Sequence, residues 1–268
     1  MPEGDTVHRL ARRLGVLTGT TVRGSDFRIP RHATADLSGA AVLGTTARGK
    51  HLLTRFDHAG QALTLHTHLR MDGEWTVLAA GRSLPRRLQA DARVVLTTTG
   101  PTAAALRMPV VELLPTDAEE SVVGHLGPDL LDPGRSADDL VEDAVGRLAA
   151  QPDRPLVTAL LDQRTVAGLG NVWVNELCFL RGHLPRTPVG EVDAEPLVRL
   201  AIRAMRFAIA PGGPGRVTTG DTRPGRRYWV YGRTHQPCLR CGTALLFSEQ
   251  GSEDPEGRHT WWCPRCQT

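Results

Sequence analysis

The chain has 268 residues, of which 40% are hydrophobic, and its formal net charge is +3. This composition excludes a disordered chain and supports packed cores in one large domain or two ordinary ones. It contains no apolar run of about 18 residues, and arginines interrupt the apolar stretch at its start, so neither a transmembrane helix nor a signal peptide is predicted. We therefore expect a cytoplasmic protein whose five cysteines are thiols or metal ligands rather than disulfides.

Basic charge is concentrated toward the C-terminus. From Pro196 onward, eleven arginines face five acidic residues, a balance of +6, whereas residues 121–150 carry a balance of −4. This distribution suits contact with phosphate groups, and it also fits an arginine-rich surface that serves only solubility. Lys50 is the only lysine in the chain. Because the pKa of a lysine moves readily and that of an arginine does not, Lys50 indicates either a functional ammonium or chance retention.

The first half of the chain predicts one helix followed by short strands. Residues 5–17 place four apolar side chains on one helical face: Val7, Leu10, Leu14 and Leu17. Strand-like runs separated by glycine and proline follow at residues 51–56, 62–66, 74–78, 93–97 and 110–114. This spacing is typical of an antiparallel sandwich or barrel, and we predict an N-terminal β-sandwich domain with a leading helix over residues 1–120.

The second half is predicted to be helical after a linker at residues 121–135. Ser136 and Asp139 resemble a capping box for a helix that reaches Ala150. Further helices are expected at residues 156–165, from the Gly168–Asn171 turn to Arg181, and at residues 195–209, followed by an irregular loop at 211–215. The predicted fold class is thus α+β with two domains, the second having a helical part at 136–227 and a finger at 228–268.

Four cysteines form two CxxC pairs near the C-terminus: Cys238, Cys241, Cys263 and Cys266. Each pair supplies two thiolates from one tight turn, and two such turns complete a tetrahedral zinc site. A redox CxxC would normally stand alone beside a βαβ unit, which is absent from the sequence. We therefore predict one structural Zn²⁺ per chain, held beside a β-hairpin of residues 244–247 and 260–262. The fifth cysteine, Cys178, lies among apolar residues and is predicted to belong to a core.

The chain begins with Met-Pro-Glu, a sequence that becomes a candidate nucleophile when Met1 is removed. The amine of Pro2 would then have a pKa near 7.7–8.0, so that roughly a tenth is neutral at pH 7, against well under a thousandth for a lysine. A neutral amine attacks a carbonyl-like carbon, and a secondary amine yields an iminium that stays charged at any pH. Glu3 beside it is a candidate acid and base. Met-Pro is also a common start without any catalytic meaning.

The Gly168-Leu169-Gly170-Asn171 turn is a candidate phosphate-binding element. Glycines let a backbone approach a phosphate closely, and the following helix offers unpaired N–H groups at its N-terminus. An ordinary turn between two helices is the alternative.

Taken together and in order, these motifs resemble the formamidopyrimidine-DNA glycosylase/endonuclease VIII family over nearly the whole chain. The matching stretches are Pro2-Glu3-Gly4, Arg48-Gly49-Lys50, His68-Leu69-Arg70-Met71, Leu126-Gly127-Pro128, Gly168-Leu169-Gly170-Asn171, Val230-Tyr231-Gly232-Arg233 and the four-cysteine finger. The opening Pro-Glu-Gly-Asp-Thr resembles the endonuclease VIII-like branch.

The resemblance implies a bifunctional DNA glycosylase and abasic-site lyase of base-excision repair, which removes oxidised bases, with pyrimidines favoured, and cleaves the strand by β,δ-elimination. It implies that Pro2 attacks C1′ while Glu3 protonates the sugar ring oxygen, and that Lys50 contacts phosphate and assists proton transfer. Asn171 and Arg258 would bind phosphates, and Arg258 would also support δ-elimination. His68 would contact DNA, and Met71 would fill the space left by the extruded base.

Three departures bear on substrate choice: Thr6 stands where a second glutamate is common, the Gln-Leu-Tyr wedge is replaced around Leu69-Arg70-Met71, and the loop after Ile209 lacks a Gly-Gly-Thr-Thr pattern. The alternative function is a non-catalytic damaged-DNA-binding protein of the same architecture, which would not need Pro2 and Glu3. We expect damaged DNA as the partner, no membrane, no small-molecule cofactor, a monomer, and association with a bacterial nucleoid.

Overall fold

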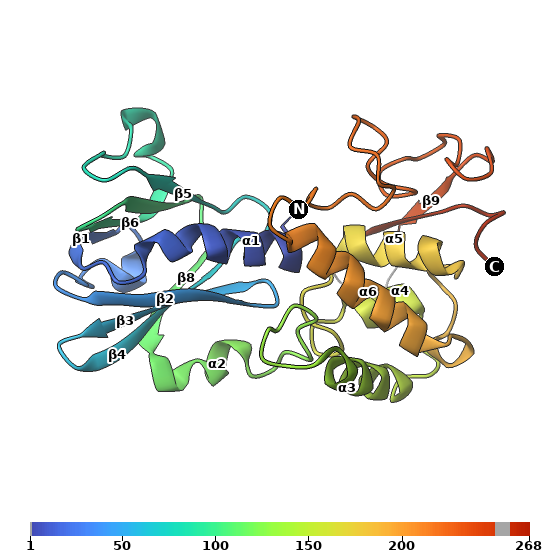
Figure 1. The fold of residues 1–268 in the computed structure, drawn as a ribbon, viewed down its shortest axis with the longest axis horizontal. Helices are drawn as coiled ribbons and strands as arrows, with labels where there is room; N and C mark the ends of the chain where they lie inside the picture. Colours follow the sequence, from blue (N-terminus) through green and yellow to red (C-terminus); the bar gives the residue numbers. More distant parts are fainter. Residues whose placement is uncertain (1, 250–257) are drawn as a thin grey trace. The chain divides into compact units, whose positions relative to one another are not determined.

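The computed structural model describes residues 2–249 and 258–268 and divides the chain into two compact units, Met1–His125 and Leu126–Thr268 (Figure 1). The division falls inside the segment 121–135 that the sequence indicates as a linker. Among the described helices, none combines the length and the apolar character needed to cross a bilayer.

The first unit contains two four-stranded antiparallel sheets and a leading helix, α1 (Gly4–Leu14). In spatial order, one sheet consists of β1 (Val22–Phe27), β6 (Ala92–Thr98), β7 (Thr102–Leu106) and β5 (Glu74–Leu78). The other consists of β2 (Ala41–Arg48), β3 (His51–His58), β4 (Gln61–His68) and β8 (Val110–Pro115). Short helical segments join or follow these strands: η1 (Gly15–Leu17), η2 (Pro30–His32), η3 (Arg86–Leu88), η4 (Thr116–Ala118) and α2 (Glu120–Val123).

One hydrophobic core holds this unit together. Val7, Ala11 and Leu14 of α1 are buried in the same cluster as apolar residues of both sheets, among them Val94 and Phe56. Every strand of the two sheets contributes at least one residue to this cluster, so the two sheets and the helix share one apolar core. The predicted β-sandwich with a leading helix is confirmed.

The second unit is helical and carries a β-hairpin. Its elements are α3 (Ala137–Ala149), α4 (Leu156–Leu161), α5 (Asn171–Arg181), η5 (Val189–Glu191), α6 (Ala194–Ile209), β9 (Leu246–Glu249) and β10 (His259–Trp262). Ser136 caps α3 as predicted, because its hydroxyl accepts a hydrogen bond of 3.1 Å from the N–H of Asp139. Trp173 of α5 and Leu197 and Met205 of α6 lie in the main apolar core of this unit.

Helix α4 ends four residues earlier than the predicted 156–165 helix. Asp162 takes an extended conformation there, and its carboxylate accepts hydrogen bonds from the Arg164 N–H at 2.9 Å and from the Arg154 guanidinium at 2.9 Å. A short acidic side chain that bonds the backbone two residues on forms a turn, which competes with continuation of the helix.

The segment after the division packs into the second unit. Leu126, Leu130 and Leu131 are buried, and the N–H of Gly127 donates a 2.8 Å hydrogen bond to the carbonyl of Gln163. A Cβ on Gly127 would lie 2.5 Å from the Arg164 carbonyl oxygen, so only glycine fits this approach.

Candidate active site and metal centre

The start of α1 places Pro2 and Glu3. Pro2 is partly exposed, whereas Glu3 is fully buried as the residue that precedes the helix. The Glu3 carbonyl accepts the N–H of Val7 at 3.0 Å, which fixes its backbone to the first turn. The side chain of Glu3 thus lies at the N-terminus of α1, directly beside Pro2 in the chain.

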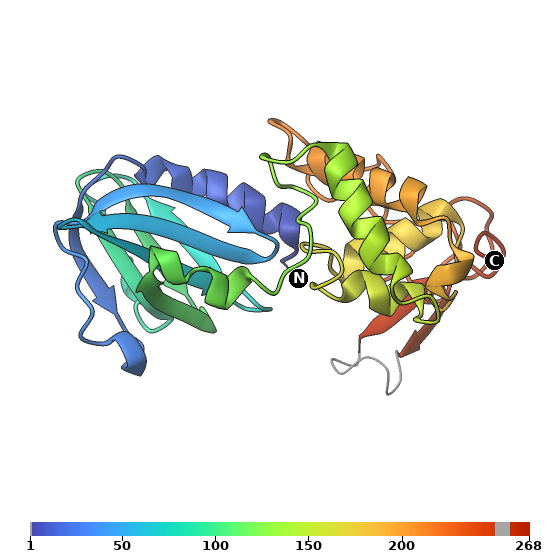
Figure 2. The same ribbon diagram turned by 90° about the horizontal axis from the view of Figure 1, so that it is seen from below.

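Lys50 lies in a two-residue hairpin turn between β2 and β3. Arg48 pairs with His51, and Gly49 has a φ of +58°, a conformation that glycine adopts without strain and that such turns require. Helix α1 packs against β2 and β3. Both ribbon views place the start of α1 and this turn at the same end of the sandwich (Figures 1 and 2). The fold therefore brings the predicted nucleophile, its neighbouring acid and the single lysine to one end of the unit.

Strand register places His68 at the same end, because His68 is the last residue of β4 and pairs with His51 at the start of β3. Beyond it, Leu69 is buried in the sandwich core and Gly73 donates a 2.8 Å hydrogen bond to the Leu69 carbonyl. This closed turn presents Met71, whose side chain is 60% exposed. An exposed, unbranched apolar side chain at a loop tip suits the predicted wedge role.

Lys50 and His68 lie beside two further histidines, His51 and His66. The ring of His51 stacks on that of His66, with centroids 5.1 Å apart, and meets the ring of His68 edge-on at 4.7 Å. Burial, reinforced by the positive charge of nearby groups, lowers the pKa of His51 to about 3 and that of His68 to about 4. Both rings are thus neutral at physiological pH.

In the second unit, α5 brings Asn171 next to the finger hairpin. The Asn171 amide donates a 2.9 Å hydrogen bond to the carbonyl of His259, and its oxygen accepts one of 3.0 Å from Asn175. Asn175 in turn accepts the N–H of Trp261 at 2.8 Å. Since Arg258 directly precedes His259, the fold brings together Asn171 and Arg258, which lie far apart in the sequence. Asn171 is only 4% exposed, which is less than we expected for a residue predicted to bind DNA phosphates.

Glu176 is a third polar residue of α5 that sequence reasoning did not single out. Its buried carboxylate accepts N–H groups of Trp229, Val230 and Tyr231 at 2.8, 2.9 and 2.9 Å, together with the hydroxyl of Thr218. Burial raises the pKa of Glu176, while these four donors oppose that rise. The carboxylate thereby holds the chain segment that leads into the finger.

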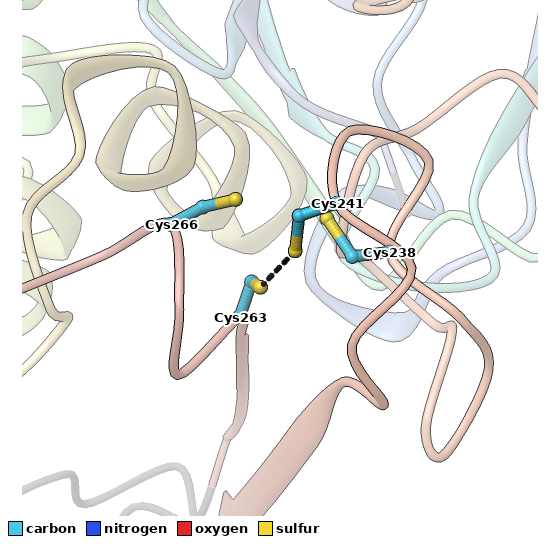
Figure 3. A group of neighbouring side chains, drawn as sticks. All are labelled: Cys238, Cys241, Cys263 and Cys266. Carbon is cyan, nitrogen blue, oxygen red and sulfur yellow. Dashed lines mark hydrogen bonds between the residues drawn. The ribbon is translucent and has the colours of Figure 1, made fainter.

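The four predicted zinc ligands converge on one point (Figure 3). Their sulfur atoms all lie within 4.8 Å of one another, and those of Cys241 and Cys263 are 3.5 Å apart. Four thiolates around a tetrahedral zinc, each at about 2.3 Å, would be separated by about 3.8 Å. The donor set therefore fits Zn²⁺, and the four cysteines are positioned to bind a metal ion.

The finger hairpin pairs β9 with β10, from Leu246 opposite Trp262 to Glu249 opposite His259. Its first strand begins two residues later than the predicted 244–247 strand, because Ala244 instead bridges Pro237 beside the first CxxC turn. Gln267 ties the second CxxC turn to the segment that follows α5, since it accepts the N–H of Cys263 and donates to the carbonyl of His183, both at 2.8 Å.

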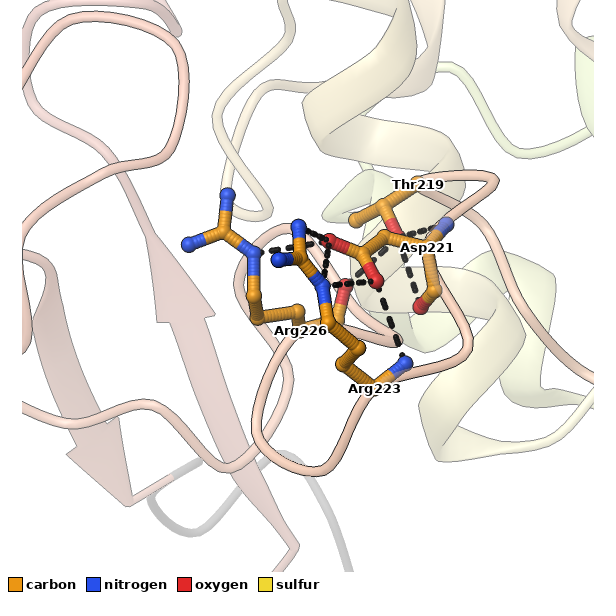
Figure 4. Close-up of polar contacts among 4 residues, drawn as sticks. All are labelled: Thr219, Asp221, Arg223 and Arg226. Atoms are coloured by element: carbon orange, nitrogen blue, oxygen red, sulfur yellow. Dashed lines mark hydrogen bonds and ion pairs between the residues drawn. The ribbon is translucent and has the colours of Figure 1, made fainter.

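The loop between α6 and the finger is basic and internally bonded (Figure 4). Asp221 accepts the guanidinium of Arg223 through Nη2 at 2.6 Å and that of Arg226 through Nε at 2.8 Å, while Thr219 accepts the Asp221 N–H. The two guanidiniums hold the pKa of Asp221 far below its usual range. One carboxylate thus orders two exposed arginines on this loop.

Comparisons with known proteins agree with this architecture. The family description "Formamidopyrimidine-DNA glycosylase N-terminal domain" matches residues 1–108. The chain is 49% identical over 269 residues to a Streptomyces coelicolor protein named "Probable endonuclease 8 2", covering 100% of this chain and 94% of that protein. It is 46% identical over 270 residues to the Mycolicibacterium smegmatis "DNA-(apurinic or apyrimidinic site) lyase Nei2", covering 100% of this chain and 99% of that protein.

Among solved structures, a complex between wild-type Lactococcus lactis Fpg (MutM) and an oxidized-pyrimidine-containing DNA superposes with a TM-score of 0.78. The identity is 24%, and the match covers 100% of both chains, so the likeness is one of fold. Together with the relatives above, it confirms the resemblance read from the motifs. The chain therefore belongs to the formamidopyrimidine-DNA glycosylase/endonuclease VIII family, in its endonuclease VIII-like branch.

Proposed function

We propose that this chain is a bifunctional DNA glycosylase and abasic-site lyase of base-excision repair. The observation that carries the proposal is the placement of Pro2 and Glu3 at the start of α1, at the same end of the sandwich as the Lys50 turn. It is supported by a relative at 46% identity that is named an abasic-site lyase. Incubation with an oligonucleotide that contains one abasic site tests it: the strand is expected to break at that site.

The chemistry begins with attack of the Pro2 nitrogen on C1′ of the damaged nucleotide. The C1′–N-glycosidic bond breaks as the base leaves with its electron pair, and the Pro2 nitrogen loses its proton to solvent. The lone pair of that nitrogen then forms a second bond to C1′ while the C1′–O4′ bond breaks, and Glu3 donates a proton to the departing ring oxygen so that the ring opens. The result is an iminium between Pro2 and C1′. Because this iminium withdraws electrons, the C2′ proton becomes acidic, and its loss expels the 3′ phosphate in β-elimination. A second elimination expels the 5′ phosphate.

Lys50 and Glu3 serve this sequence differently. The Lys50 ammonium attracts the flanking phosphate and passes protons during elimination, a role that a lysine can take and an arginine, which stays protonated, cannot. Glu3 is buried next to Pro2 in the chain, and it serves as the general acid that protonates the sugar ring oxygen.

Each of the two units has its own set of residues for DNA contact. His68 and Met71 lie at the Lys50 end of the sandwich, where His68 donates to a phosphate and Met71 fills the space of the flipped nucleotide. Asn171 and Arg258 belong to the second unit, where the start of α5 and the finger hairpin offer N–H and guanidinium donors. Zn²⁺, when bound by the four cysteines, keeps this hairpin folded and takes no part in the chemistry. A monomer that acts on bacterial DNA in the cytoplasm fits this assignment.

The alternative function, a non-catalytic sensor of damaged DNA, would need neither a free Pro2 amine nor a buried Glu3. Such a protein would bind the abasic oligonucleotide and leave its strand intact. Binding without cleavage, by protein shown to begin at Pro2, would favour the sensor.

We expect a preference for oxidised pyrimidines over 8-oxoguanine. The endonuclease VIII-like start and the missing Gly-Gly-Thr-Thr pattern after Ile209 motivate this expectation. Single-turnover excision of thymine glycol and of 8-oxoguanine from matched duplexes is the measurement. Faster release of 8-oxoguanine would contradict it.

Arg258→Ala is expected to shift abasic-site products from β,δ-elimination toward β-elimination alone. The phosphate that leaves in the second elimination is an anion, and a guanidinium placed by the zinc-held hairpin stabilises its departure. Gel separation of the two 3′ ends at saturating enzyme measures the ratio, with Arg240→Ala, a finger residue whose guanidinium packs 4.4 Å from the Phe179 ring centre, as the matched control. An unchanged product ratio with weaker binding would make Arg258 an anchor only.

A further inference from the structure

Four histidines gather on one face of the β2–β3–β4–β8 sheet, at the end that carries Lys50. His51 and His68 are cross-strand partners, His66 lies two residues before His68 on the same face, and the ring of His125 lies 6.1 Å from that of His51. Only His68 has a role in the reaction described above. The group lies entirely within the first unit.

Hydrogen bonds join two of these histidines to Glu112 in a chain with a defined direction. Glu112 of β8 lies 3.3 Å from Nδ1 of His66 through one oxygen and 3.4 Å from an Arg31 nitrogen through the other. A carboxylate only accepts, so His66 carries its proton on Nδ1 and offers the lone pair of Nε2. Nδ1 of His51 lies 2.8 Å from that lone pair and therefore donates to it. The chain fixes both the ring orientation and the tautomer of His51.

His68 has the opposite tautomer. Its Nδ1 accepts the N–H of Arg70 at 3.1 Å, so its proton lies on Nε2, and its ring is packed edge-on against that of His51. Burial, together with the charges of Arg70, Lys50 and the neighbouring histidines, lowers the pKa of these rings, and Glu112 opposes that effect at His66. The rings of this cluster are thus neutral, and the charged groups Lys50, Arg70 and the Arg31–Glu112 pair lie beside them.

We propose that His51 is a positioning residue for Lys50 and His68, held in place by the Arg31–Glu112–His66 chain. His51 follows Lys50 in the chain, so a fixed His51 ring fixes one end of the two-residue turn that carries the ammonium. The same ring supports His68, which then presents its Nε2–H to a phosphate as a neutral donor. The proposal rests on the assigned roles of Lys50 and His68 and adds the residues that set their geometry.

The test compares two substitutions of His66. Glutamine can donate through its amide to Glu112 and accept from His51 through its carbonyl, as the histidine does, whereas leucine fills similar space and does neither. For His66→Leu, kcat/KM of abasic-site cleavage is expected to fall about 10- to 100-fold, the range that follows from a misplaced catalytic group. His66→Gln should stay within about threefold of the wild type. His58→Leu, at the far end of β3, is the matched control and should leave cleavage unchanged.

Thermal unfolding shows whether each variant is folded, and the fraction trapped by borohydride normalises the rates to active protein. Equal losses in the leucine and glutamine variants, or none in either, would overturn the proposal, because the hydrogen bonds would then be irrelevant to cleavage.

Long-range ¹H–¹⁵N spectra of the imidazole rings give a readout that does not need activity. The wild type should show Nδ1–H tautomers for His51 and His66 and Nε2–H for His68, and His66→Leu should lose the fixed tautomer of His51. Wild-type protein that shows these tautomers but does not cleave the strand would count against the proposed function. It would still support the hydrogen-bonded series from Arg31 to His51. An Nε2–H tautomer at His51 in the wild type would contradict the hydrogen bond that His51 is inferred to donate to His66.

Discussion

Strand cleavage at an abasic site is expected to fall at least about a hundredfold when an extra residue remains in front of Pro2. The added peptide bond converts the amine into an amide, whose nitrogen has no nucleophilic lone pair. The next amine at this end of the sandwich is Lys50, and at pH 7 a lysine is neutral several hundred times less often than a terminal amine, roughly four parts in ten thousand against about a tenth. If Lys50 replaced Pro2 as the nucleophile, the cleavage rate would therefore still fall by at least about a hundredfold.

The measurement uses one protein in two forms. An N-terminal tag is followed by a protease site whose cleavage leaves Pro2 as the first residue, and cleavage rates are compared before and after tag removal. Recovery of the rate on removal excludes misfolding as the cause of the loss. A tagged protein that cuts as fast as the untagged one would rule out the Pro2 amine.

Loss of zinc is expected to have the second large effect. Structural zinc sites of four thiolates contribute on the order of 10–16 kcal/mol of apparent binding free energy at neutral pH, which is larger than the stability of most domains. In Cys238→Ser the hairpin of β9 and β10 should unfold, and its hydrogen bonds to Asn171 and Asn175 of α5 should be lost. DNA affinity should fall at least about tenfold, because Arg258 and Asn171 lose their fixed positions.

The matched control is Cys178→Ala, which removes a thiol that is buried in the helical core away from the four ligands. Elemental analysis should find one zinc per chain in the wild type and in this control, and well below one in Cys238→Ser. The sandwich of the first unit has its own core and should stay folded in all three proteins. One zinc per chain and unchanged DNA affinity in Cys238→Ser would contradict the assignment.

Parts of the fold were predictable where the sequence pattern is unambiguous. The run at 74–78 alternates polar and apolar residues from Glu74 to Val77 and is β5 with the predicted bounds, and the two CxxC pairs converge as their spacing indicates. Three strands were not predicted: β1, β2 and β7. The first two each contain a glycine at an irregularity in their register, and β7 is rich in alanine, a weak strand former that is buried here between β6 and β5.

The spatial arrangement of the predicted site residues could not be read from the sequence. His66 and His68 alternate along one strand, which signals a shared face, yet their partners His51 and Glu112 become visible only when the register of β3, β4 and β8 is known. Similarly, no local pattern shows that the Asn171 amide faces the carbonyl of His259, 88 residues away. Hydrogen bonds between distant segments depend on tertiary structure, which periodicity does not encode.

Peptide mapping of a borohydride-trapped complex tests the central claim most directly. Reduction of the iminium on an abasic-site oligonucleotide leaves a stable bond between C1′ and the attacking nitrogen, and proteolysis with mass spectrometry then locates the modified residue. The mechanism proposed here predicts the adduct on the N-terminal peptide that begins at Pro2. An adduct on the peptide that contains Lys50 would contradict it.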